Sequence, residues 1–268
     1  MPLQRLLTAL VLVGLFLPSL YVLPSSGWLA VCILLVGIAA QEWARLSGIK
    51  NAAGCIAFAV LVGVSTSLIS LVPWLQFGWF AAAALFWVAI APWLLYRATF
   101  PRASLLSLAA GLVILTAAGG AMAALRNVSP SLLLALMAII WISDSSAYFS
   151  GRRFGQNKLA PKVSPGKTWE GVAGAMLMVL AYATALTVFL PNIVMPKWLP
   201  PSEAHYGLIA FWLFLAALGI VGDLIESLLK RSAGVKDSGN ILPGHGGMLD
   251  RIDALLPMLP LAALFYLR

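Results

Sequence analysis

Residues 206–229 read YGLIAFWLFLAALGIVGDLIESLL, and this stretch decides the fold class. It is long enough for an α-helix to cross the roughly 30 Å of hydrocarbon in a bilayer, at about 1.5 Å per residue. Two acidic residues, Asp223 and Glu226, lie in its last two turns. The pattern predicts a membrane-spanning helix that ends in a polar environment, directly before the charged segment 230–253.

The composition extends this prediction to the whole chain. Hydrophobic residues make up 62% of the 268 positions and charged residues 10%, whereas roughly a quarter of the residues in a soluble domain are charged. The sequence therefore predicts an all-α polytopic integral membrane protein. The first apolar run is long for a secretory signal and lacks an A-x-A cleavage site, so we expect an uncleaved helix. In total we expect about nine membrane-spanning helices, near Arg5–Leu23, Gly27–Leu46, Ala52–Leu71, Gly78–Tyr96, Ala103–Leu125, Ser131–Ser150, Trp169–Leu190, Tyr206–Leu229 and Arg251–Leu267.

The distribution of Lys and Arg predicts the orientation, because positively charged loops stay on the cytoplasmic side. Alternate loops place 14 of the 17 basic residues on one side of the membrane. The N-terminus is therefore predicted to be cytoplasmic and the C-terminus to lie outside. The loops after the sixth and eighth spans share the cytoplasmic face and carry nine basic residues. This concentration suits an anionic substrate at the membrane surface, although topology or lipid-headgroup contact would explain any single basic residue.

The sixth predicted span contains Asp144, about two turns from its cytosolic end. A carboxylate within a span costs about 2.5 to 3.5 kcal/mol on insertion scales, so this side chain should face a polar cavity or a cation. The alternative is a structural carboxylate that is paired with a neighbouring helix.

The polar segment after this span leads into SPGKTWEG, residues 164–171. Its Gly-Lys-Thr triplet resembles part of a Walker A loop, but the first glycine of that pattern would fall on Pro161, so we reject a P-loop. Ser164, Lys167 and Thr168 instead predict anion binding near the N-terminus of the seventh span, where backbone N–H groups and the helix dipole favour negative charge. Helix capping by Ser164 or Thr168 is the alternative.

Helix spacing groups the charged side chains of 222–253 into two faces. Asp250 and Asp253 are spaced i, i+3 and should share a face at the start of the ninth span. The loop before them, Val235–Met248, is Gly-rich, which allows the backbone to turn tightly and to approach a ligand. Four residues at the cytosolic end of the eighth span are spaced i, i+4, i+7 and i+8, so they should project from one helix face. They are Asp223, Ser227, Lys230 and Arg231.

Carboxylates that converge from several helices need a cation to offset their repulsion. Oxygen ligands beside basic residues fit Mg²⁺ that is bridged to substrate phosphates. A zinc site is not expected, because His245 is the only His in this region and no Cys lies nearby in the sequence. The residues alone thus favour metal-assisted phosphoryl or nucleotidyl transfer.

Residues 227–253, SLLKRSAGVKDSGNILPGHGGMLDRID, resemble the signature of the phosphatidate cytidylyltransferases, also called CDP-diacylglycerol synthases. The stretch 144–171, DSSAYFSGRRFGQNKLAPKVSPGKTWEG, is also similar, with Asp144 and Ser145 standing where bacterial members often have Asp-Thr-Gly. The resemblance covers about residues 141–253. The matching signature positions are Ser227, Lys230, Arg231, Lys236, Asp237, Pro243, His245, Gly246, Gly247, Asp250, Arg251 and Asp253.

The resemblance implies an enzyme of bacterial phospholipid biosynthesis that converts CTP and phosphatidate to CDP-diacylglycerol and pyrophosphate. It would lie in the bacterial cytoplasmic (inner) membrane as one domain over residues 1–268, with its active site facing the cytosol. Residues 1–130 would be mainly a helical scaffold, and residues 131–268 would carry the catalytic helices and cytosolic loops. The implied partners are CTP, phosphatidate and membrane lipid, with a homodimer as the assembly and no nucleic acid.

The resemblance also implies roles for individual residues. Asp223, Asp250 and Asp253 would be Mg²⁺ ligands, with Asp144 as a further candidate and K⁺ as an example of a second, monovalent cation. Ser227 would help to hold metal or phosphate. Lys230 and Arg231 would act in catalysis by neutralising phosphate charge. The predicted substrate-binding residues are Ser164, Lys167, Thr168, Lys236, Asp237, His245, Gly246, Gly247 and Arg251.

Two alternative functions remain open at this point. A related CTP-dependent transferase would use another membrane lipid phosphate, such as an archaeal ether lipid or a polyprenyl phosphate. An ion-coupled transporter would use its carboxylates to carry a cation, but such sites usually lie at the membrane midplane within broken helices. The predicted carboxylates of this chain gather at one surface beside a basic loop, which favours the transferase.

Overall fold

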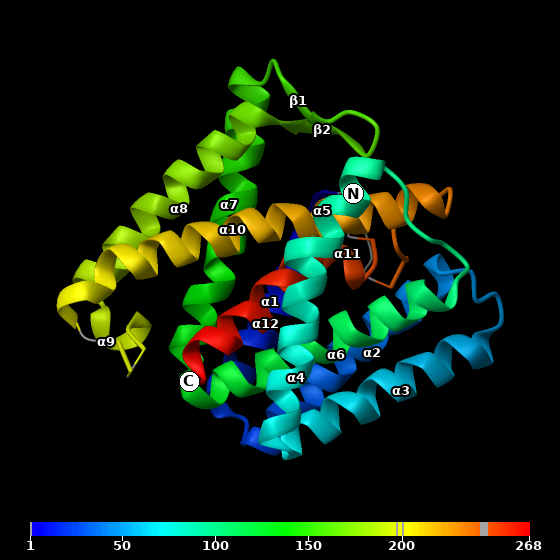
Figure 1. Ribbon diagram of the computed structural model, residues 1–268, viewed down its shortest axis with the longest axis horizontal. Coiled ribbons are helices and arrows are strands. Elements are labelled where there is room, and N and C mark those ends of the chain that lie inside the picture. Colours follow the sequence, from blue (N-terminus) through cyan, green and yellow to red (C-terminus); the bar gives the residue numbers. More distant parts are fainter. Residues whose placement is uncertain (1, 197, 200, 242–245) are drawn as a thin grey trace.

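The computed structural model describes residues 2–196, 198–199, 201–241 and 246–268, and in these ranges the chain is a bundle of helices with one short β-hairpin (Figure 1). Helices occupy most of the chain on both sides of the hairpin. In chain order the elements are α1 (Pro2–Val22), α2 (Ser25–Leu46), α3 (Ala52–Leu71), α4 (Pro73–Leu85), the π-helical turn η1 (Phe86–Ile90), α5 (Ala91–Arg97), α6 (Leu105–Val128), α7 (Pro130–Phe154), β1 (Lys158–Ala160), β2 (Ser164–Thr168), α8 (Trp169–Phe189), α9 (Pro191–Val194), α10 (Pro201–Ser232), α11 (Leu249–Ile252) and α12 (Leu255–Tyr266).

Seven helical segments of the described chain are long and apolar enough to cross a membrane, which confirms the polytopic all-α class. They correspond to the second through eighth predicted spans. The segment 73–97 combines α4, η1 and α5, so the fourth span contains a π-helical turn. Helix α1 covers the first predicted span. The total of nine spans and the orientation of the termini stay predictions.

The ninth predicted span differs from the expectation of one continuous helix, because it is divided into α11 and α12. Pro257 lies four residues after Asp253. Because proline has no N–H, it cannot donate the helical hydrogen bond to the Asp253 carbonyl, so a continuous helix through both residues would be interrupted. It is tolerated in the first turn of α12. With 12 residues, α12 is about 18 Å long, which is shorter than the hydrocarbon thickness.

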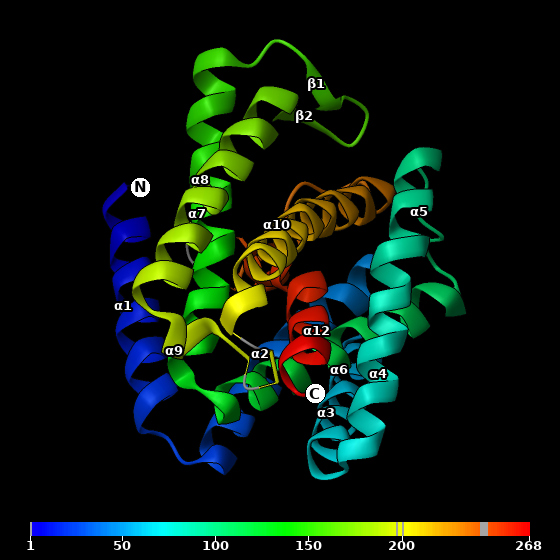
Figure 2. The same ribbon diagram turned by 60° about the vertical axis from the view of Figure 1, so that its left-hand side comes forward.

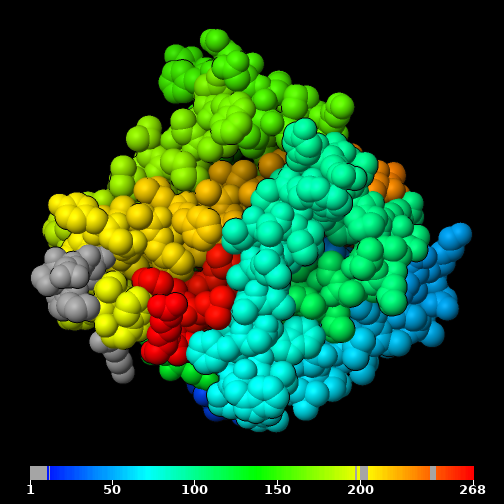
Figure 3. All heavy atoms as spheres, viewed as in Figure 1, coloured from blue at the N-terminus to red at the C-terminus, as the bar shows by residue number. Residues whose placement is uncertain are grey.

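Helix α12 belongs to the core of the molecule. Most of its residues are buried, and it packs against α6, α10 and α4. Gly222 of α10 lies against the turn before α12, where a Cβ atom would collide with the Asp253 carbonyl and with Pro257. In the space-filling view, the C-terminal residues show between α10 and α4 (Figure 3).

Helix α10 packs against several other helices. Helices α7 and α8 pack side by side as an antiparallel pair, and α10 contacts both of them as well as α5 (Figures 1 and 2). The hairpin at the far end of the α7–α8 pair was not part of the all-α expectation. Its strands are antiparallel, with Lys158 opposite Thr168 and Ala160 opposite Ser164. The hairpin directs the segment between α7 and α8 back toward α10.

Candidate active site

A cavity of about 540 Å³ lies where α7, the β-hairpin, α8, α10 and the α11 region meet. The two polar segments of the sequence therefore come together, as predicted from their shared side of the membrane. The lining combines charged and polar side chains with a few apolar ones. The lining residues are Asp144, Ala147, Tyr148, Leu159, Ser164, Gly166, Lys167, Thr168, Gly171, Val172, Ile220, Asp223, Asp250, Arg251 and Asp253.

A contact between Lys167 and Asp223 joins the two polar segments. The Lys167 Nζ atom lies 2.6 Å from Asp223 Oδ2, and the side chains retain 25% and 33% of their exposure. Ser227, one turn along α10, donates a hydrogen bond of 3.3 Å to the other carboxylate oxygen of Asp223. Partly exposed charges of this kind can exchange partners at low cost, because water competes with the contact.

The Thr168 hydroxyl caps α8. It accepts a hydrogen bond of 3.2 Å from the Gly171 N–H, and the side chain is buried. Of the two residues for which helix capping was the alternative, Thr168 is the one that caps α8. Ser164 lies at the start of β2 and lines the cavity, so it is too far from the end of α8 in the chain to act as its cap.

Asp250 is held by a second set of donors. Lys230 Nζ lies 2.6 Å from Asp250 Oδ1 and also contacts the buried carboxylate of Glu226. Asp250 accepts further hydrogen bonds from the backbone N–H groups of Ser238, at 3.1 Å, and Gly247, at 2.8 Å. Burial would raise the pKa of Asp250, but the hydrogen bonds that it accepts from Lys230 and from the Gly247 N–H, together with the Lys230 charge, outweigh it and lower the pKa to about 2. The carboxylate is thus ionised at any physiological pH.

The cavity's acidic groups suit a metal ion that substrate helps to bind. Asp144, Asp223 and Asp253 reach it from three different elements and supply oxygen donors. Within the described ranges, no three His, Cys, Asp or Glu side chains are arranged to hold a metal ion by themselves. Mg²⁺ commonly takes one or two protein carboxylates and completes its coordination with phosphate oxygens and water. The donor set therefore fits Mg²⁺ whose coordination is completed by ligands other than protein side chains.

Comparison with known proteins identifies the family. The model of the cytidylyltransferase family matches residues 3–267. The chain belongs to the cytidylyltransferase family. It is 38% identical over 268 residues to the phosphatidate cytidylyltransferase of Pseudomonas aeruginosa, covering 97% of this chain and 95% of that protein.

Two further relatives match over part of the chain. The phosphatidate cytidylyltransferase of Haemophilus influenzae is 46% identical over 135 residues, which are 50% of this chain and 45% of that protein. The phosphatidate cytidylyltransferase of Bacillus subtilis is 46% identical over 122 residues, or 46% of this chain and 42% of that protein.

The structure of this cytidylyltransferase brings eight of the predicted site residues to the cavity. Asp250 and Asp253 both line it, as their i, i+3 spacing predicted. Their chemical roles stay predictions. The eight are Asp144, Ser164, Lys167, Thr168, Asp223, Asp250, Arg251 and Asp253.

The remaining predicted site residues in the described part of the chain are not among those that line the cavity. Lys230 is 13% exposed and is directed to Glu226 and Asp250. Arg231 is exposed and donates to the Val235 carbonyl at the end of α10. Lys236 and Asp237 are exposed. The other four are Ser227, which donates to Asp223, Gly246, whose φ of 81° favours glycine, Gly247, which donates to Asp250, and His245, which lies outside the described residues.

The sequence prediction missed Glu42, which contacts the Gly-rich loop from α2. Glu42 is fully buried and accepts hydrogen bonds from the Ser238 hydroxyl at 3.0 Å and from the backbone N–H groups of Met248 and Leu249 at 3.0 and 2.7 Å. A signal was present, because an acidic residue inside an apolar span is costly unless it is paired or hydrogen-bonded. Glu226, also buried, carries the same signal.

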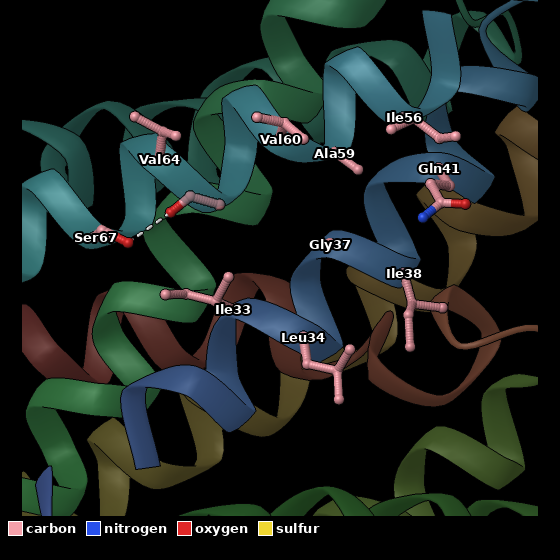
Figure 4. A pocket seen from close by; sticks show the side chains of 11 residues that line it. Ile33, Leu34, Gly37, Ile38, Gln41, Ile56, Ala59, Val60, Val64 and Ser67 are labelled. Carbon is pink, nitrogen blue, oxygen red and sulfur yellow. Dashed lines mark hydrogen bonds between the residues drawn. The ribbon is translucent and has the colours of Figure 1, made fainter. Parts of the chain in front are cut away.

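A second hollow, of about 460 Å³, lies between α2 and α3 (Figure 4). Its lining is apolar except for Gln41 and Ser67, and the Ser67 hydroxyl donates to the Gly63 carbonyl of its own helix. No titratable side chain lines this hollow, so it supplies no groups for the transfer reaction.

Proposed function

We propose that this cytidylyltransferase transfers the cytidylyl group of CTP to phosphatidate, giving CDP-diacylglycerol and pyrophosphate in phospholipid biosynthesis. The observation that carries the proposal is the cavity that joins Lys167 and Asp223 beside Asp144 and Asp253. The similarity to a phosphatidate cytidylyltransferase over 97% of the chain supports the same acceptor and donor. The transporter alternative is set aside, because the chain belongs to a transferase family.

The chemistry requires positioning and charge neutralisation more than a strong base. A phosphate oxygen of phosphatidate forms a bond to the α-phosphorus of CTP as the bond from that phosphorus to the leaving pyrophosphate breaks. The attacking phosphate monoester is already anionic at neutral pH, so alignment and electrostatic stabilisation carry most of the rate.

Lys167 is the cation best placed for the triphosphate. Because the Lys167 and Asp223 side chains are both partly exposed to the cavity, Lys167 can exchange Asp223 for a phosphate oxygen. Ser164 and Arg251 line the same cavity and supply further donors. The apolar residues Leu159, Val172 and Ile220 provide the surface on which a lipid substrate can lie.

Asp223 and Asp253 are the proposed Mg²⁺ ligands, with Asp144 as a third candidate. When bound, Mg²⁺ neutralises phosphate charge and aligns the reacting groups. Asp250 remains a proposed ligand, although one of its oxygens accepts from Lys230 and the other from Ser238 and Gly247. A monovalent cation such as K⁺ is a further proposal that rests on family resemblance.

The location and assembly are proposals as well. The apolar helices support a multi-pass membrane protein, the family resemblance implies the bacterial inner membrane, and the charge distribution favours a cavity that faces the cytosol. A homodimer, and the absence of a nucleic-acid partner, stay predictions of the sequence. So does the division into a scaffold over residues 1–130 and a catalytic part over residues 131–268.

The direct test is incubation of the purified protein in detergent with labelled CTP, Mg²⁺ and phosphatidate. We expect a labelled lipid that co-migrates with CDP-diacylglycerol, and release of pyrophosphate. A polyprenyl phosphate and an archaeal ether-lipid phosphate serve as competing acceptors, and preferential labelling of either would replace phosphatidate as the substrate. Equal rates with Mg²⁺ and after chelation would contradict the proposed metal.

A further inference from the structure

Glu42 stands apart from the other carboxylates near the site, because all of its hydrogen bonds in the described residues go to one loop. It lies on α2, which is far from that loop in the sequence. Its three donors, the Ser238 hydroxyl and the N–H groups of Met248 and Leu249, lie at 2.7 to 3.0 Å and belong to the segment that ends at α11. Hydrogen bonds to a buried carboxylate are roughly twice as strong as those between neutral groups.

The loop is shaped around this carboxylate. A Cβ atom on Gly239 would collide with one oxygen of Glu42, and a Cβ atom on Gly247 would collide with both oxygens and with the Ser238 hydroxyl. These two glycines of the Gly-rich loop therefore allow the backbone to approach Glu42. A bound nucleotide is therefore not needed to explain these two glycines.

The contacts continue from Glu42 to the cavity. Gly247, which packs on Glu42, donates its N–H to Asp250 at 2.8 Å, and Ser238 donates its N–H to the same carboxylate at 3.1 Å. Met248 and Leu249, the two backbone partners of Glu42, directly precede Asp250 in the chain. A displacement of this backbone would move Asp250, and Asp253 one turn later, relative to Asp223.

We propose that Glu42 is a positioning residue of the transferase, whose carboxylate fixes the backbone at 247–249 and so places Asp250 and Asp253 in the cavity. This inference rests on the proposed function, because the reaction is what the placement serves. Groups that orient metal-binding or catalytic side chains typically contribute 10- to 100-fold to metal affinity or activity.

The decisive variant is Glu42→Gln, which keeps the size of the side chain but places an amide donor against N–H donors. We expect kcat to fall by about 10- to 100-fold and the Mg²⁺ concentration for half-maximal activity to rise. Glu42→Asp retains the charge and should recover part of the rate. Gln41→Ala, its neighbour on the same helix at the apolar hollow, is the matched control and should leave both quantities unchanged.

A second measurement does not depend on activity. Hydrogen–deuterium exchange should become faster at the amides of residues 247–249 in Glu42→Gln, while exchange in α8 stays as in the wild type. Gly239→Ala should lower the melting temperature of the wild-type protein. The same substitution should lower the melting temperature of the Glu42→Ala variant by less, because Glu42→Ala removes the atoms with which the new methyl group collides.

The outcomes separate the two proposals. A wild-type protein that forms no labelled lipid overturns the proposed function, while the exchange experiment still tests the position of the loop. If the wild type is active and Glu42→Gln has the same kcat, Mg²⁺ dependence and exchange at residues 247–249, the proposed role of Glu42 is overturned. A lower melting temperature with unchanged Mg²⁺ dependence and unchanged exchange at 247–249 also overturns it, since it indicates a general effect on stability.

Discussion

Two Lys–Asp contacts of the same length, 2.6 Å, involve carboxylates that line the cavity, and their surroundings differ. The Lys167–Asp223 pair keeps 25% and 33% of its side-chain exposure, whereas the Lys230–Asp250 pair keeps 13% and 9%. The second pair also includes the buried carboxylate of Glu226 and two backbone N–H donors to Asp250. The partly exposed pair can exchange partners at low cost, whereas the buried one holds the loop and α10 together.

Removing a cavity carboxylate should have the largest effect on the reaction. Asp253 lies beside the Asp223 end of the exposed pair, lines the cavity and is a proposed metal ligand. Asp253→Asn keeps the shape but loses the charge, so we expect CTP-dependent pyrophosphate release to fall by about 100-fold or more. The amount of folded protein, measured by gel filtration in detergent, should match the wild type. Activity within about threefold of the wild type would remove Asp253 from the metal site.

Removing the cation of the buried pair should mainly reduce stability. Lys230→Met leaves Glu226 and Asp250 without their shared partner, and breaking a buried ion pair in this way typically costs about 3 to 5 kcal/mol. We expect a lower melting temperature and poorer extraction in detergent. Lys50→Met removes an exposed Lys outside the cavity lining and should not alter either measurement. An unchanged melting temperature in Lys230→Met would show that the two pairs do not differ as described.

Removing the cation of the exposed pair should have a smaller effect on stability and a selective effect on CTP. Lys167→Met should raise the KM for CTP and lower kcat/KM by about 10- to 100-fold, equivalent to about 1.4 to 2.7 kcal/mol. The melting temperature should stay close to that of the wild type, because exposed ion pairs contribute about 0 to 1 kcal/mol. Lys162→Met, an exposed Lys of the same hairpin outside the cavity lining, is the control. If both variants behave alike, Lys167 has no special contact with CTP.

The sequence predicted the parts of this arrangement that depend on local patterns. Apolar length identified the spans, and the loop charges placed the segments around Lys167 and Asp223 on one side, where the structure joins them. Helix spacing predicted that Asp250 and Asp253 lie together, and both line the cavity. These features depend on residues that are near one another in the chain.

The features that were missed depend on contacts between distant segments. Glu42 and Ser238 are 196 positions apart, and periodicity carries no information about such a pair. Spacing along α10 grouped Lys230 with Asp223, but Lys230 is directed to Asp250 because that carboxylate and Glu226 offer a buried partner. The break of the last span after Asp253 was readable from Pro257, but apolar composition concealed it.

The most direct test of the central claim is labelled-lipid formation from CTP and phosphatidate by equal amounts of folded wild-type protein and Asp223→Asn. Asp223 is the residue at which Lys167, from the hairpin, meets α10. We predict labelled CDP-diacylglycerol with the wild type and a loss of about 100-fold or more in the variant. Absence of labelled lipid with the wild type, or equal formation by the two proteins, would contradict the assignment of the reaction to this cavity.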